Sequence, residues 1–178
     1  MLDAAARLAA DGGFDGVQMR VVAAEAEVAL GTLYRYFPSK EHLLVSTMLR
    51  QIGTLAEALS DRPPRGNNAA ERVTDVLRRA NRALQRQQQF TIAMVRALST
   101  GDQTIAPVVR EVRELMASII VDAIGVDGEV DDDTILRAHL IQEVWLSAQV
   151  GWIGGVEPME SVDEKLAAAA RLLLGELP

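Results

Sequence analysis

Residues 31–44 read GTLYRYFPSKEHLL and place Tyr34 and Tyr36 directly ahead of a Phe-Pro-Ser-Lys step. The chain holds only two tyrosines, three phenylalanines and two tryptophans in 178 residues, so both tyrosines fall within one helical turn. A core does not need phenol groups, because leucine, valine and alanine supply apolar surface without a hydroxyl to satisfy. Two phenols ahead of Lys40 therefore predict a surface that binds an anion.

Length and composition limit the classes of protein to which the chain can belong. With 178 residues, of which 49% are hydrophobic, the chain can form one domain or one body with a small subdomain. No stretch approaches about 18 uninterrupted apolar residues, and the first residues lack the basic region and cleavage step of a signal peptide. The absence of cysteine excludes disulfides and thiolate metal sites. We therefore expect a soluble cytoplasmic protein without a membrane partner.

The net charge of −7 argues at first sight against a nucleic-acid partner. Its distribution weakens that objection, because residues 1–50 carry a net charge of −1 and the rest of the chain carries −6. A nearly neutral N-terminal part can still present basic groups on one face, although its non-specific binding to DNA would be weak. The charge count alone leaves DNA open as a partner.

Helical periodicity runs through the whole chain, and no segment alternates as a strand does. Pro38 ends one helix because the residue before a proline avoids the helical region, and Ser39 is a suitable N-cap for the next helix. The fold is therefore predicted to be all-α, with about nine helices. The expected helices cover residues 2–11, 18–25, 30–36, 40–59, 69–88, 91–100, 105–125, 133–153 and 161–174.

Two short helices, expected over residues 18–25 and 30–36, follow a first supporting helix. Helix-turn-helix units have this arrangement, and their second helix lies in the major groove of DNA. Gly31 and Thr32 bring a minimal side chain and a hydroxyl to the N-terminal end of that helix, which is the part that approaches base edges. We expect Leu33 to face inward and the polar residues of this helix to face outward.

Lys40 stands in the first turn of a helix, where the helix dipole disfavours a cation by about 0.3–1 kcal/mol. A local rule that is broken in this way is often found at a functional site. Backbone N–H groups at the start of a helix bind phosphate, and an adjacent ammonium strengthens such a site. We interpret Tyr34, Tyr36 and Lys40 as an edge that grips phosphate. Thr32 and Arg35 would lie nearer the bases.

The pattern alone leaves other classes of protein open. Tyrosine in a helix is often a core residue, and three-helix units also occur in interaction domains, so a helical adaptor that binds no DNA is one alternative. An enzyme is a weaker alternative. His139 and Glu143 have the spacing of helical metal ligands, but no third ligand is evident, and a half-buried histidine paired with Glu143 is the simpler interpretation. No catalytic residue, metal site or cofactor is predicted.

The segment GTLYRYFPSKEHLL, preceded by AAEAEVAL, resembles the recognition helix and the following helix of TetR-family transcriptional repressors. The nine-helix layout of that family is similar to the number of helices expected here. The resemblance implies a helix-turn-helix DNA-binding domain over residues 1–46 and a ligand-binding and dimerisation domain over residues 47–178. The residues that it implies for DNA binding are Gln18, Arg20, Ala29, Leu30, Gly31, Thr32, Tyr34, Arg35, Tyr36 and Lys40.

Several positions depart from the common pattern of that family. Glu27 occupies the position of the usual turn glycine, Ala29 and Leu30 replace a Ser-Lys pair, and Gln18 replaces a threonine cap. The missing serine and lysine leave fewer polar contacts to bases and phosphates. These departures bear on which operator sequence is read and not on whether DNA is bound.

A narrower resemblance concerns the actinobacterial repressors of cholesterol catabolism. It rests on EVALGTLYRYFPSKEHLLVS together with the short segments NRALQRQ, AMVRA, VWLSAQVGW and ARLLLGE. Those repressors leave DNA when they bind coenzyme A thioesters of sterol-derived acids. The resemblance implies a repressor of lipid or sterol catabolism genes whose partners are operator DNA and an apolar effector or its coenzyme A thioester. A regulator that responds to an unrelated hydrophobic compound is the alternative.

Apolar and aromatic stripes in the C-terminal part are the candidate effector site and dimer interface. Such stripes suit an apolar cavity, although they more often form ordinary core. Arginines spaced i, i+4, i+8 from Arg78 would hold coenzyme A phosphates or form a solvated face. The candidate ligand residues are Phe90, Met94, Leu98, Met116, Trp145, Gln149, Trp152, Arg82 and Arg86. The candidate interface of a homodimer, built as a four-helix seam, consists of Leu136, Leu140, Val144, Leu166, Ala169 and Leu173.

Overall fold

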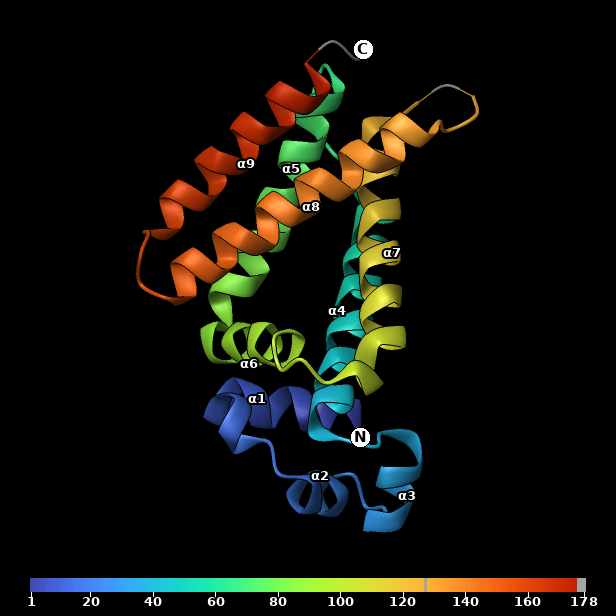
Figure 1. The fold of residues 1–178 in the computed structure, drawn as a ribbon, viewed down its shortest axis with the longest axis vertical. Coiled ribbons are helices and arrows are strands. Elements are labelled where there is room, and N and C mark those ends of the chain that lie inside the picture. Colours follow the sequence, from blue (N-terminus) through green and yellow to red (C-terminus); the bar gives the residue numbers. More distant parts are fainter. Residues whose placement is uncertain (127, 176–178) are drawn as a thin grey trace. The chain divides into compact units, whose positions relative to one another are not determined.

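The computed structural model describes residues 1–126 and 128–175, and this part of the chain is helical without a strand (Figure 1). The described residues form nine α-helices and one short 3-10 helix, so the all-α prediction is confirmed. The helices are α1 (Leu2–Gly16), α2 (Met19–Glu25), α3 (Leu30–Tyr36), α4 (Lys40–Asp61), α5 (Ala69–Arg86), α6 (Gln88–Leu98), η1 (Gln103–Ile105), α7 (Ala106–Ile124), α8 (Asp132–Ile153) and α9 (Met159–Leu174).

The helix boundaries differ from the periodicity at two places, because α6 begins at Gln88 and not at residue 91, and because α1 passes through the glycine pair. The glycine pair at 12–13 was expected to end the first helix, but α1 continues to Gly16 across a kink at Gly13, whose φ is 62° and ψ is −156°. Glycine adopts this conformation without a steric penalty, so it bends the helix instead of ending it. The Ser39 cap is confirmed, because the backbone N–H of His42 donates to Ser39 Oγ at 3.1 Å.

The chain divides into two compact units that are interleaved along the sequence. Unit 1 contains residues 1–52 and 84–112, and unit 2 contains residues 53–83 and 113–178, of which residues 127 and 176–178 lie outside the described part. Two consecutive domains that meet at residue 46 were expected. In the structure the N-terminal helices share their compact unit with α6 and with the first part of α7.

Unit 1 is built on the packing of α1 along α6, while α2 contacts both α1 and α3. Ala5 and Ala9 of α1 are fully buried, and such small side chains allow neighbouring helices to approach closely. Further buried side chains come from α2, α3 and α4, namely Val22, Ala23, Leu33, Leu43 and Leu44. The helix-turn-helix therefore rests on the same core as α6.

In unit 2, α8 packs against α9, and α5 and α7 add further core residues. Arg72 of α5 donates from Nε to the carbonyl of Ala123 at 3.0 Å and from its terminal nitrogen to the carbonyl of Ile124 at 2.5 Å. These bonds satisfy carbonyls at the end of α7 that have no partner within that helix. None of the helices in the described part combines the length and apolar character required to cross a membrane.

Candidate DNA-binding surface and effector site

The helix-turn-helix unit exposes nearly all of its second helix. α3 buries only Leu33, which is fully inaccessible, as its inward-facing position predicted. The turn at 26–29 joins α3 to α2, whose buried side chains are Met19, Val22 and Ala23. One buried leucine holds the short α3 in place and leaves its other side chains available to a partner.

Most of the predicted DNA-binding residues lie at the surface. Tyr34 and Tyr36 are 46% and 56% exposed, so the alternative in which they are core residues is wrong. The guanidinium of Arg35 lies 5.3 Å from the centre of the Tyr36 ring, which places a cation beside this phenol. Exposed with them are Gln18, Arg20, Ala29 and Gly31, while Leu30, Thr32 and Lys40 are half-buried.

Lys40 has a partner within unit 1 that sequence reasoning did not find. Its Nζ donates to the carbonyl oxygen of Phe14 at 3.1 Å and lies 3.9 Å from the centre of the Phe14 ring. This contact explains a cation in the first turn of α4, where the helix dipole opposes it. An ammonium has three donors, so this bond leaves two for a phosphate. The role of Lys40 at DNA stays a prediction.

Phe14 also receives a second cation, which comes from α6. The guanidinium of Arg96 lies 4.3 Å from the centre of the Phe14 ring and pairs with Asp15 at 2.8 Å. Phe14 is buried, so its ring fills the junction of α1, α4 and α6. No short sequence signal links residue 14 to residue 96, and the contact follows only from the packing of α1 on α6.

The predicted effector residues fall into the two units. Phe90 and Met94 are buried in α6, with Leu98 half-buried beyond them, and these three belong to unit 1. Met116, Trp145, Gln149 and Trp152 belong to unit 2, where Met116 and Gln149 are buried and both tryptophans are half-buried. Their role as effector contacts stays a prediction.

Asn81 of α5, which sequence reasoning missed, joins two of those residues in a buried polar cluster. Its Oδ1 accepts hydrogen bonds from Nε1 of Trp145 at 2.6 Å and from Nε2 of Gln149 at 2.7 Å. Its Nδ2 donates to Asp163 of α9 at 2.7 Å. The signal was an amide side chain on the apolar face of α5, between Leu77 and Leu84 at helical spacing.

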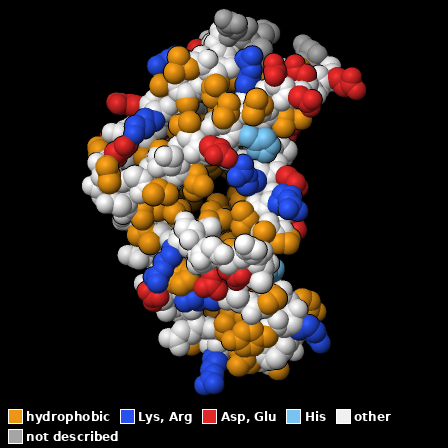
Figure 2. Space-filling model, in the orientation of Figure 1, with side chains coloured by type: hydrophobic (Ala, Val, Ile, Leu, Met, Phe, Trp, Pro, Cys, Tyr) orange, Lys and Arg blue, Asp and Glu red, His pale blue; other side chains and the backbone are white. Residues whose placement is uncertain are grey.

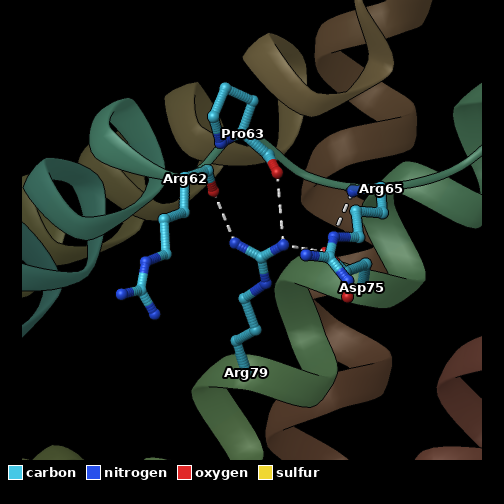
Figure 3. A network of polar contacts seen from close by, with 5 residues as sticks. All are labelled: Arg62, Pro63, Arg65, Asp75 and Arg79. Atoms are coloured by element: carbon cyan, nitrogen blue, oxygen red, sulfur yellow. Dashed lines mark hydrogen bonds and ion pairs between the residues drawn. The ribbon is translucent and has the colours of Figure 1, made fainter.

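The arginines of α5 have different surroundings. Arg79 donates to the carbonyls of Arg62 and Pro63 at 2.5 and 3.2 Å and pairs with Asp75, which also accepts from the backbone N–H of Arg65 (Figure 3). The guanidinium of Arg79 therefore binds the segment before α5. The remaining members of the run, Arg78, Arg82 and Arg86, are exposed, and Arg78 lines a groove of about 750 Å³ together with Arg65 and Arg171.

An exposed apolar face lies on α8 and α9, where Figure 2 shows hydrophobic side chains gathered at the surface. Leu140, Val144 and Leu173 line a groove of about 520 Å³ between these helices, and Leu136 is exposed as well. Ala169 is half-buried. Leu166 is 1% exposed and belongs to the core of unit 2, so its inclusion in the dimer interface was wrong.

The candidate metal ligands do not form a site. Glu143 pairs with Arg113 at 2.7 Å, and Nδ1 of His139 is buried without a hydrogen-bond partner among the residues that the structure describes. The predicted pairing of His139 with Glu143 was therefore wrong, because the carboxylate faces α7 instead. The described residues contain no group of three or more histidine, aspartate or glutamate side chains that would hold a metal ion.

Two family models match this chain. Residues 1–47 match the model described as bacterial regulatory proteins of the tetR family. Residues 66–173 match the model described as the tetracyclin repressor-like C-terminal domain. Together these matches span the helix-turn-helix unit and most of the remaining helices.

Known proteins resemble the chain over nearly its full length. It is 41% identical over 176 residues to the HTH-type transcriptional repressor KstR of Rhodococcus jostii strain RHA1, covering 99% of this chain and 82% of that protein. A TetR transcriptional regulator from Rhodococcus sp. RHA1 superposes with a TM-score of 0.90 at 31% identity, covering 99% and 94% of the two chains. FadR of Bacillus subtilis, solved in complex with stearoyl-CoA, shares the fold with a TM-score of 0.65 at 20% identity, covering 99% and 97%.

Proposed function

The chain belongs to the tetR family of bacterial regulatory proteins, and on this premise we propose that it represses lipid or sterol catabolism genes until an effector releases it from DNA. The observation that carries the proposal is the likeness to KstR, a transcriptional repressor, over 99% of this chain. The chain is a regulator and not an enzyme, because its relatives are transcriptional repressors. Its site of action is the bacterial cytoplasm, where operator DNA lies.

The exposed residues of α3 are the proposed means of reading DNA. Thr32 stands in the first turn of α3, and Arg35 and Tyr36 are exposed one turn later. A hydroxyl near the start of a recognition helix can reach a base edge, whereas tyrosine and arginine side chains farther along can reach phosphate oxygens. The proposal assigns base reading to Thr32 and backbone positioning to the Tyr34–Tyr36 edge with Lys40. It moves Arg35 from the bases, where the sequence had placed it, to the phosphates, because its guanidinium lies beside the Tyr36 ring.

An operator selected from a random duplex pool gives a direct test of DNA binding. Arg35→Ala should weaken binding to all selected sequences and lower the slope of log K against log salt by about one. Thr32→Ala should change the preferred sequence instead, with a similar slope. Arg110→Ala is the matched control, because it removes an exposed arginine from α7. Selection that enriches no sequence, or equal loss in the Arg35 and Arg110 variants, would contradict the proposal.

The proposed effector is a sterol-derived acid or its coenzyme A thioester. The KstR likeness supports the sterol part, and the complex of FadR with stearoyl-CoA makes a thioester a reasonable probe. Within this chain, Arg78 with Arg65 and Arg171 offers cations to phosphates, because guanidinium groups match phosphate geometry. A tenfold loss of operator affinity needs only about 1.4 kcal/mol of differential effector binding.

Titration of the protein–operator complex decides the class of effector. The probes are the coenzyme A thioester of a sterol acid, its free acid, and stearoyl-CoA. We expect the sterol thioester to dissociate the complex at the lowest concentration. Release by stearoyl-CoA alone would point to a fatty-acid regulator, and release by none of the three would reject the lipid and sterol class.

A further inference from the structure

Gly31 of α3 is a glycine that the fold does not require. Its φ lies outside the left-handed region, so alanine can adopt the same backbone conformation. A Cβ atom added at Gly31 would meet no atom from another part of the described chain within 4 Å. Glycine in a helix is less favourable than alanine, because it loses more conformational freedom on folding. The folded chain by itself therefore gives no reason for glycine at this position.

Two other helical glycines have equally open surroundings, but each stands beside a structural feature of its own. Gly12 of α1 directly precedes the kink at Gly13. Gly53 of α4 is the first residue of unit 2 and follows the end of unit 1. Gly31 lies at neither a kink nor a boundary between units. The explanation that remains is the close approach of another molecule to the backbone of α3, which is a common use of glycine.

Gly31 occupies the side of α3 that faces away from the core. Successive residues of a helix are about 100° apart, so Gly31 points about 160° away from Leu33, the one buried residue of α3. Gly31 is exposed. Arg35 follows one turn later on the same side, with its guanidinium 5.3 Å from the centre of the Tyr36 ring. A partner that docks on α3 therefore comes nearest to the helix backbone at Gly31.

The surface around Gly31 offers no hydrogen-bonding side chain. Ala29, Leu30 and Gly31 are consecutive, and of these Ala29 and Gly31 are exposed and Leu30 is half-buried. In the major groove the edges of guanine, adenine and cytosine present acceptors and amino groups, and covering these with apolar surface leaves them unpaired. Thymine also presents a C5-methyl group, which gains from apolar contact. The methyl group of thymine therefore suits this surface best.

We propose that a thymine methyl group of the operator packs against the backbone of Gly31, in the space that a Cβ atom would occupy. This inference rests on the proposed function and names one base that α3 reads. It adds a second base contact to the one assigned to Thr32. A methyl group added to the protein at Gly31 and the methyl group of thymine would compete for the same space, so removing one should compensate for adding the other.

The operator selected from the random duplex pool is the starting material for the test. Each of its thymines is replaced in turn by deoxyuridine, which lacks only the C5-methyl group, in both half-sites at once. For the wild-type protein we expect one such replacement to weaken binding by about tenfold, which corresponds to about 1.4 kcal/mol. This scan needs no variant protein, so it can refute the inference by itself.

Gly31→Ala should reverse the preference at that position. The variant should bind the thymine operator about tenfold or more weakly than the wild type does, and should bind the deoxyuridine operator more tightly than the thymine operator. Its Tm should equal or exceed that of the wild type, because alanine fits the helix. Gly12→Ala is the matched control, since it adds a methyl group at another open, exposed glycine of unit 1, and it should keep the wild-type preference for thymine.

The results that would overturn the inference differ from the result that would reject the proposed function. If no single deoxyuridine weakens wild-type binding, there is no methyl contact, although the protein still binds DNA. A thymine preference that Gly31→Ala retains unchanged would place the methyl group against another residue, and a lower Tm of this variant would show that the fold requires the glycine. Selection that enriches no operator would instead reject the proposed function, and the contact with it.

Discussion

Glu27 adopts a backbone conformation that costs free energy. It lies in the turn between α2 and α3 with φ at 54°, and it is the one non-glycine residue with positive φ in the described part of the chain. A side chain in the left-handed region costs about 1–2 kcal/mol, part of which glycine returns through its greater freedom in the unfolded state. We expect Glu27→Gly to raise the free energy of unfolding by about 0.5–1 kcal/mol, measured by urea denaturation.

Glu27→Ala is the matched control for this change. It removes the same charge but keeps a Cβ atom in the left-handed region, so it should not stabilise the protein. If both variants stabilise equally, charge repulsion and not backbone strain would be the cause. The family resemblance had already marked the position, since a glycine is usual there, and the structure supplies the physical reason.

Lys40 is expected to affect both stability and DNA binding. Lys40→Ala removes the hydrogen bond to the Phe14 carbonyl, so the free energy of unfolding should fall by about 1 kcal/mol. If the remaining donors of the ammonium meet phosphate, the slope of log K against log salt should also fall by about one. Lys40→Arg, which keeps the charge, should retain the slope. Loss of stability with an unchanged slope would leave Lys40 a purely structural role.

For single residues, the sequence predicts whether a side chain is exposed better than it predicts which residue that side chain contacts. The outward position of Tyr34 and the burial of Leu33 follow from helical periodicity, which is local. The partner of Lys40 lies 26 residues away and the partners of Asn81 lie more than 60 residues away, so no spacing rule finds them. An asparagine on the largely apolar face of α5 was the one local hint of the buried cluster.

α1, α4 and α6 come from distant parts of the sequence and meet at one side chain, Phe14 of α1. Phe14 holds the cations of Lys40 and Arg96 over its ring at 3.9 and 4.3 Å. A cation–π contact is worth about 0.5–2 kcal/mol, the upper part of this range applying where water is excluded. We expect Phe14→Leu to lower the free energy of unfolding by about 1–2 kcal/mol more than Phe90→Leu does.

Phe90→Leu is a suitable control because Phe90 is also buried in unit 1, and the cation–π contacts found among the described residues do not involve its ring. Both substitutions remove a similar volume, so the difference between them isolates the cation contacts. Hydrogen exchange should locate the effect, with faster exchange of α1 amides in Phe14→Leu. Equal destabilisation by both variants would show that only the ring volume matters.

The packing of α6 on α1 bears on the route of regulation. α4 continues past the helix-turn-helix and is one connection between an effector and DNA. α6 carries Phe90 and Met94 and packs along α1, so it offers a second route within unit 1. Helix existence and type were predictable from periodicity, whereas this contact joins residues about 80 positions apart and was not.

The whole molecule is expected to act as a homodimer, because two half-sites on DNA are read by two recognition helices. The proposed seam is the exposed apolar face of α8 and α9, where Leu140 is 44% exposed and lines the groove with Leu173. A symmetric interface uses the same patch from both chains, so each substitution enters it twice. Removing one buried leucine costs about 1.5–3 kcal/mol, and a buried unpaired carboxylate adds to this cost.

Leu140→Glu should therefore raise the dimer dissociation constant by roughly 10³-fold or more and yield monomers at micromolar concentration. Leu146→Glu is the matched control, since Leu146 is 43% exposed on the same helix but points about 120° away from Leu140. Light scattering measures the mass, and binding to a two-half-site operator should fall in parallel with the dimer. If Leu146→Glu dissociates the protein and Leu140→Glu does not, the seam lies on the other side of α8, and the groove beside Leu173 has another occupant.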